Sequence, residues 1–321
     1  MTNPWVQSAR LRTLPLALSS VLLGTSLSNL HGPVYWDLFA LVVFISVGLQ
    51  ILSNYANDYG DFLKGTDTQA GRKDRMLSAN KIRPQQMKQV LIGLSGAIFG
   101  LGIFTLMYAY RTYGLSSYAV GILLFFGLLA IAAAVMYTIG KKAYGYSGFG
   151  DVSVILFFGI VPVVGIGVLM GVGPQPSLWL GGIGVGLLSA AVLNINNYRD
   201  LNSDKKSGKR TLAVSIGPKA TLQYQRFLLI LGFVGLFGSL AYDLYQLLRL
   251  ESSTSYIEML LLFGVFSPSA VFLSRYYSEM RTLKPGERDA LNLQLKRVSL
   301  TILILCVIHF GLSFYVTSLF R

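Results

Sequence analysis

Charged residues are scarce in this chain, making up 13% of its 321 residues against 53% for hydrophobic residues. A soluble domain carries about a quarter of its residues as charged groups, so the composition excludes an ordinary water-soluble protein. The single cysteine, Cys306, can form neither an internal disulfide nor a cysteine-based metal site. With only two histidines in the chain, no Ser–His or Cys–His arrangement stands out that would supply a nucleophile.

Long apolar runs occupy most of the sequence. Runs such as 41–49 and 122–135 are apolar on nearly every face, whereas the strands of a membrane β-barrel alternate in polarity. We therefore predict an all-α integral membrane protein, with residues 1–321 forming a single domain. The start of the chain lacks the cleavage pattern of a signal peptide, so we expect the first span to be retained. The nine spans are predicted near 13–30, 36–57, 89–108, 116–137, 148–171, 178–197, 227–248, 256–274 and 298–319.

The basic residues are distributed asymmetrically between the predicted connections. All but three of the 27 lysine and arginine residues fall in the N-terminus or after spans two, four, six and eight; the exceptions are Arg111, Arg249 and Arg321. Connections rich in lysine and arginine stay on the cytoplasmic side of a membrane, so the N-terminus is predicted inside and the C-terminus outside. The net charge of +13 then reflects topology, and we expect no nucleic-acid partner.

Two cytoplasmic connections, near 58–88 and 198–226, are long and polar, and each begins with the pattern Asn-x-x-x-Asp at the end of an apolar span. The repetition after four further spans suggests an internal duplication. The residues of the two motifs are Asn57, Asp58, Asp61 and Asp67 in the first and Asn196, Asp200 and Asp204 in the second.

The spacing of these motifs has a chemical meaning. Residues four apart share one face of a helix, so Asn57 and Asp61 project together, as do Asn196, Asp200 and Asp204, although like charges at that spacing repel. Carboxylates near lipid must be paired or bind a metal. Ligand sets with oxygen only favour a hard cation, and Mg²⁺ shares its coordination with substrate phosphates. The plainer interpretation is that both motifs are solvated helix ends.

Basic and aromatic residues near the two motifs are further candidates. Lysine and arginine bind phosphate and stabilise the charge on a leaving group, although most of these residues would also serve as lipid-facing charges. Aromatic faces stabilise cations, and the alternative for the tyrosines is an interfacial belt. Asp151 opens the fifth span, where the helix dipole alone favours an acid. The candidates for substrate binding are Arg75, Tyr137, Lys142, Tyr144, Asp151, Lys209 and Arg210.

Four segments together resemble a known family. They are LRTLPLA (11–17), QILSNYANDYGDFLKGTD (50–67), YGYSGFGDVSVILFFG (144–159) and VLNINNYRDLNSDKKSGKRTLAVSIG (192–217). Their paired aspartate-rich motifs resemble those of the UbiA superfamily of intramembrane prenyltransferases. The flanking residues are similar to one branch, the 1,4-dihydroxy-2-naphthoate polyprenyltransferases of menaquinone synthesis.

The resemblance implies a fold, a reaction and a set of roles. The protein would lie in the cell inner membrane, and its helices would surround a central cavity open to the cytoplasm. The partners would be membrane lipid and two substrates, polyprenyl diphosphate and 1,4-dihydroxy-2-naphthoate, and prenylation with loss of CO₂ would give demethylmenaquinol. The two motifs would hold Mg²⁺ ions that bind the diphosphate. The residues expected to act in catalysis are Asp61, Asp200, Lys209 and Arg210.

The match also has departures. Many superfamily members carry a third aspartate where this chain has Gly65, with Asp67 nearby, and the Arg-Pro that often follows the first motif in hydroxybenzoate and haem relatives is missing. Two alternatives remain open at this point. One is the same fold acting on 4-hydroxybenzoate, a haem ring or a chlorophyllide; the other is a cation transporter, whose polar residues would be expected nearer the midplane.

Overall fold

The computed structural model describes residues 3–66, 75–140, 143–250 and 271–320, and within these ranges it contains helices and connections but no β-strand. Residues 271–280 are also helical. The other elements are α1 (Pro4–Ala9), η1 (Leu11–Thr13), α2 (Leu14–Asn29), α3 (Trp36–Leu63), α5 (Pro84–Tyr113), α6 (Ser117–Met136), η2 (Tyr144–Tyr146), α7 (Gly150–Ile155), the π-helical turn η3 (Leu156–Ile160), α8 (Val161–Leu169), α9 (Pro176–Lys206), α10 (Leu212–Leu250) and α12 (Arg288–Phe320).

Seven stretches of the described chain are long and apolar enough to cross a membrane: α3, α5, α6, the continuous α7–η3–α8 segment, α9, α10 and α12. This agrees with seven of the nine predicted spans. The first predicted span corresponds to α2, which has 16 residues, fewer than the roughly 20 that cross a bilayer core. Most of the predicted span 256–274 lies outside the described residues. The protein is a multi-pass, all-helical membrane protein.

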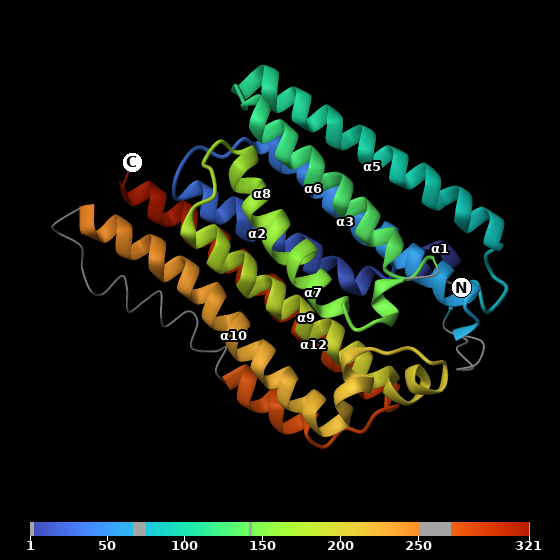
Figure 1. The fold of residues 1–321 in the computed structure, drawn as a ribbon. Helices are drawn as coiled ribbons and strands as arrows, with labels where there is room; N and C mark the ends of the chain where they lie inside the picture. Colours follow the sequence, from blue (N-terminus) through green and yellow to red (C-terminus); the bar gives the residue numbers. More distant parts are fainter. Residues whose placement is uncertain (1–2, 67–74, 141–142, 251–270, 321) are drawn as a thin grey trace.

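The helices lie side by side in an elongated bundle (Figure 1). The α5 helix lies at one edge and α10 at the opposite edge, while α2 and α9 contact helices on several sides. The N-terminus and the C-terminal ends of α3, α6 and α9 lie at one end of the bundle. The C-terminus and the α2–α3 and α8–α9 connections lie at the other end (Figure 1). This is the alternation that the distribution of basic residues predicts.

Small residues and hydroxyl groups determine how closely the inner helices approach. A Cβ added to Gly184 on α9 would lie 2.5 Å from the backbone nitrogen of Leu236 on α10, so the two backbones are in contact there. Pro162 has no N–H to donate to the carbonyl of Phe158 four residues earlier, and the Ser20 hydroxyl of α2 donates to that carbonyl instead. Both contacts bring neighbouring helices close together, and the Ser20 hydroxyl also satisfies the Phe158 carbonyl.

The two helices that carry the motifs are longer than the sequence predicted. The α3 helix continues to Leu63 and α9 to Lys206, so the polar motifs are helical and the expected connection over 198–226 is wrong. Residues 207–211 separate α9 from α10, and α10 itself is kinked at Gly217, which has a φ of 80° and precedes Pro218. In both α3 and α9 the apolar part of the sequence ends before the helix does. The last helical turns carry polar side chains, which pair with neighbouring segments.

Candidate active site

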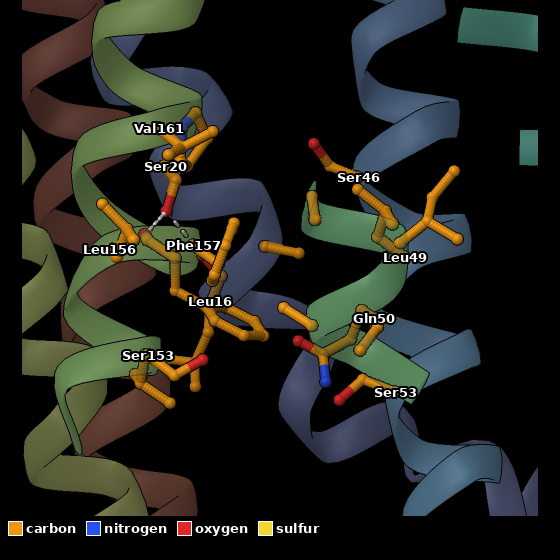
Figure 2. A pocket seen from close by; sticks show the side chains of 18 of the residues that line it. Leu16, Ser20, Ser46, Leu49, Gln50, Ser53, Ser153, Leu156, Phe157 and Val161 are labelled. Atoms are coloured by element: carbon orange, nitrogen blue, oxygen red, sulfur yellow. Dashed lines mark hydrogen bonds between the residues drawn. The ribbon is translucent and has the colours of Figure 1, made fainter. Parts of the chain in front are cut away.

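A cavity of about 560 Å³ lies between α2, α3, α5, α6, the α7–η3–α8 segment and α9. Most of its wall is apolar, with Ile98, Ile103 and Phe126 among the lining residues. Polar side chains gather toward the end of the bundle where α3 and α9 end. Figure 2 shows part of this cavity, with Ser46 and Gln50 of α3 on one side of the space and Leu16 of α2 and Leu156 of η3 on the other.

The last turns of α3 place Asp61 in a basic and aromatic environment. Asp61 is 2% exposed. Its carboxylate accepts hydrogen bonds from Tyr146 Oη at 2.6 Å and from Arg75 Nη2 at 3.3 Å, and Lys209 Nζ lies at 3.9 Å. With its amide oriented to satisfy both neighbours, Asn57 donates to Asp61 at 3.1 Å and accepts from Arg10 at 3.3 Å. The first motif is therefore held by cations from three separate segments.

The last turns of α9 place Asp200 against its sequence neighbour Arg199. The Arg199 guanidinium donates to both carboxylate oxygens, at 3.0 and 2.6 Å, and also to Asn196 Oδ1 at 2.5 Å. A fourth donation, at 2.6 Å, reaches Asn292 on α12. The pair is buried, with side-chain exposures of 4% and 6%. Arg199 thus aligns the second motif and ties α9 to α12.

The predicted metal ligands do not all face the cavity. Asn57, Asn196, Asp200 and Asp204 line it, but Asp58 and Asp61 are not among its lining residues. Asp58 is buried and accepts a hydrogen bond from Ser8 of α1 at 2.8 Å. Asp61 is linked to the cavity wall through Asn57, Arg75 and Lys209, which contact it and line the space. Asp67 lies outside the described residues.

The predicted substrate-binding residues are also divided. Arg75, Tyr137, Tyr144 and Lys209 line the cavity. Asp151 is buried at the start of α7 and accepts a hydrogen bond from Tyr224 of α10 at 3.4 Å, which is outside the cavity lining. The side chain of Arg210 is exposed, and its backbone N–H donates to the Tyr146 carbonyl at 3.1 Å. Lys142 lies outside the described residues.

Two tyrosines that line the cavity, just after the C-terminal end of α6, contact each other. The rings of Tyr137 and Tyr144 meet edge to face, with centroids 5.3 Å apart, and the Tyr144 hydroxyl donates to the Ala133 carbonyl at 2.6 Å. Burial raises the pKa of both hydroxyls, so the rings stay neutral. A neutral ring face can stabilise a neighbouring cation.

Tyr146 lies between two lysines beside Asp61. Lys64 Nζ is 3.6 Å from the centre of the Tyr146 ring and Lys209 Nζ is 4.9 Å from it. Burial lowers the pKa of Lys64, the Asp61 charge opposes that shift, and the Lys209 charge adds to it. Positive charge is therefore concentrated at the polar end of the cavity, where it would attract an anionic ligand.

Three residues of this region were not among the sequence predictions: Arg199, Arg10 and Gln50. Arg199 precedes Asp200 directly, and an arginine beside a buried acid was the signal for its role. Arg10 follows α1 with a φ of 49°, an uncommon conformation for a residue with a side chain. Gln50 lies seven residues before Asn57, on the same face of α3, and a glutamine within an apolar run was the signal there.

The side chains at the polar end fit a hard divalent cation. Asparagine and aspartate oxygens line the cavity, and no histidine or cysteine does so among the described residues. No three acidic, histidine or cysteine side chains come together within the described ranges. The site therefore suits an ion that takes one or two carboxylates and completes its coordination with water and substrate phosphate, as Mg²⁺ does.

Comparison with known proteins places the chain in a family. The UbiA prenyltransferase family matches residues 17–281. A 1,4-dihydroxy-2-naphthoate octaprenyltransferase of Haemophilus influenzae is 36% identical, covering 94% of this chain and 93% of the relative. Its counterpart in Escherichia coli is 39% identical, covering 88% and 87%.

Solved structures agree on the fold. A UbiA homologue from Archaeoglobus fulgidus bound to DMAPP and Mg²⁺ covers 94% of this chain and 98% of its own, with a TM-score of 0.59 at 13% identity. The apo structure of a homologue from Aeropyrum pernix gives a TM-score of 0.61 at 15% identity, covering 93% of this chain. With a family match over most of the chain and relatives aligned nearly end to end, the protein belongs to the UbiA prenyltransferase family and is a membrane prenyltransferase.

Proposed function

We propose that this protein transfers a polyprenyl group from polyprenyl diphosphate to 1,4-dihydroxy-2-naphthoate with loss of CO₂, giving demethylmenaquinol for menaquinone synthesis. The observation that carries the proposal is the pair of naphthoate-prenylating relatives aligned over 93% and 87% of their own lengths. The cavity supports it, because one continuous space joins a polar, cationic end to a long apolar wall. Those two environments suit the diphosphate and the isoprenoid chain of the donor.

The proposed donor site uses the charges at the end of α3 and α9. Lys209 and Arg75 line the cavity and would bind the diphosphate oxygens as charge accumulates on the leaving group. Asp61 holds both of these cations in place. The oxygens of Asn57, Asn196, Asp200 and Asp204 would hold Mg²⁺, which when bound neutralises the diphosphate and makes it a better leaving group. Asp58, Asp67, Lys142, Asp151 and Arg210 remain proposals on sequence grounds alone.

The proposed reaction requires no protein nucleophile. The bond from the prenyl C1 to the diphosphate oxygen breaks, and C1 bonds to the ring carbon that carries the carboxylate. The electron pair of the bond to the carboxylate returns to the ring as CO₂ leaves, so charge is balanced without an added oxidant or reductant. Tyr137 and Tyr144 would offer neutral ring faces to the allylic cation. The apolar wall would exclude the water that would quench it.

We propose the nine-span topology as well, with the N-terminus, the polar end of the cavity and the active site on the cytoplasmic side of the inner membrane. The asymmetry of lysine and arginine supports this orientation. The described residues supply seven of these spans. A transporter is not supported, because the family is one of prenyltransferases.

The purified protein tests the proposal with labelled polyprenyl diphosphate and 1,4-dihydroxy-2-naphthoate. We expect prenylated product and CO₂ in equal amounts, loss of both on chelation, and recovery with Mg²⁺. Asp61→Ala and Asp200→Ala should each lower the rate by about 10²-fold or more. Asp289→Ala, which removes an exposed acid at the start of α12, is the matched control and should not change the rate.

If the protein prenylates 4-hydroxybenzoate but not the naphthoate, the proposed acceptor is rejected, while the proposed prenyl-transfer reaction is still supported. Full activity in both Asp61→Ala and Asp200→Ala would reject the proposed site.

A further inference from the structure

A polar stripe runs along the cavity face of α3, deeper than the aspartate motif. Ser46, Gln50, Ser53 and Asn57 follow one another at spacings of four, three and four residues, and all four line the cavity. Figure 2 shows the first three pointing from α3 into the space shared with Leu16 and Ser153. An isoprenoid chain does not need hydrogen-bonding groups there, and polar groups on its wall would weaken its binding.

Gln50 is the buried member of this stripe with unused hydrogen-bonding capacity. The residue is 5% exposed. Its Nε2 donates to Thr13 Oγ1 at 3.1 Å, but its Oε1 is buried and has no hydrogen-bond partner among the described residues. In Figure 2 that oxygen points toward the open space beside Leu16. A buried carbonyl oxygen without a partner is unfavourable, so a ligand that donates to it would be favoured.

The orientation of the Gln50 amide is fixed by Thr13. The Thr13 hydroxyl gives its proton to the Arg10 carbonyl at 2.9 Å and also accepts from Asn54 Nδ2 at 3.0 Å. Because its single proton is already donated, Thr13 Oγ1 can only accept from Gln50. The amide nitrogen must therefore face Thr13, and Oε1 must face the cavity as an acceptor.

The same network connects Gln50 with the aspartate motif. Asn54 also donates to the Ala9 carbonyl at 2.8 Å, and Arg10 contacts Asn57, which contacts Asp61. Seven residues of α-helix separate Gln50 from Asn57, a rise of about 10 Å. Gln50 thus lies about two helical turns along α3 from the proposed donor diphosphate site and lines the same cavity.

We propose that Gln50 determines acceptor specificity: its Oε1 accepts a hydrogen bond from a ring hydroxyl of the aromatic acceptor, and Thr13 is the positioning residue for its amide. The inference rests on the proposed function. Of the reaction partners, the diphosphate and the isoprenoid chain carry no hydrogen-bond donor, so the hydroxylated acceptor is the one that can satisfy this oxygen. A bound water is the competing occupant.

Kinetics and inhibition with four variants test the proposal. Gln50→Leu removes the acceptor atom at nearly constant size, and we expect the KM for the naphthoate to rise about tenfold, as for the loss of one hydrogen bond. The KM for the donor should stay within about twofold. Thr13→Val should also raise the acceptor KM, and Thr13→Ser should restore it. Gln85→Leu, the same change at an exposed position on α5, is the control.

Competitive inhibition by the two monomethyl ethers of the naphthoate identifies the hydroxyl. One ether should bind the wild type about tenfold more weakly than the parent acid but bind Gln50→Leu as well as the parent does. Equal weakening by both ethers in wild type and Gln50→Leu would overturn the proposal. So would an equal rise of donor and acceptor KM. No weakening by either ether in the wild type would assign Oε1 to water and overturn it too.

The proposed function and this inference fail separately. If the wild type prenylates 4-hydroxybenzoate instead of the naphthoate, the proposed acceptor is rejected, and the same comparison with 4-methoxybenzoate as inhibitor decides the role of Gln50.

Discussion

At the residue scale, the two motif aspartates are stabilised differently although their sequence contexts are alike. Asp61 is bound by Arg75, Tyr146 and Lys209 from other segments. Asp200 is bound on both oxygens by the adjacent Arg199. A buried ion pair is costly to break, because the carboxylate that remains has lost the charge that compensated its desolvation.

We therefore predict that Arg199→Gln lowers the unfolding free energy by about 3–5 kcal/mol. Arg297→Gln is the matched control, because the Arg297–Glu279 pair has side-chain exposures of 45% and 48% and an exposed pair contributes about 0–1 kcal/mol. Thermal unfolding in detergent measures both. Equal midpoints for the two variants would show that the buried pair is not a stabilising contact.

At the element scale, α9 is the helix around which the bundle is organised. It contacts α2, α7, η3, α8, α10 and α12, and most of its apolar stretch is buried inside the protein. Glycines allow this position, because the backbones of α9 and α10 touch at Gly184, Gly232 and Gly235. Small residues at helix interfaces are the usual device for close packing in lipid.

Gly184→Ala should therefore destabilise the protein by about 1–3 kcal/mol, since its methyl group would lie 2.5 Å from the Leu236 nitrogen and 2.7 Å from the Gly235 carbonyl carbon, both backbone atoms. Gly238→Ala on α10 meets nothing within 4 Å, so the better helix propensity of alanine should make it neutral or slightly stabilising, by about 1 kcal/mol or less. Unfolding midpoints of the two variants in detergent compare them directly; destabilisation of similar size in both would argue against backbone contact as the cause.

At the scale of the whole molecule, the prediction is its orientation in the membrane. In a Cys306→Ala background, we expect Gln85→Cys to react with an impermeant maleimide only after the membrane is opened, and Ser117→Cys to react in intact cells. Both positions are exposed, at the starts of α5 and α6, where the two ends of the bundle should face opposite compartments. The reverse pattern would place the active site outside.

The sequence by itself determined that this is a helical membrane protein, because low charge and long apolar runs leave lipid as the solvent and helices as the way to satisfy the backbone. It also determined that Asn57 and Asp61, and likewise Asn196, Asp200 and Asp204, share a helix face, because that follows from helical spacing alone. Only the tertiary structure decided which groups face the cavity. Asp58 and Asp151 bond to Ser8 and Tyr224 instead, and the amide of Gln50 is oriented by Thr13, which lies 37 residues earlier. These side-chain orientations depend on contacts between segments far apart in the chain, so they cannot be predicted from the local sequence.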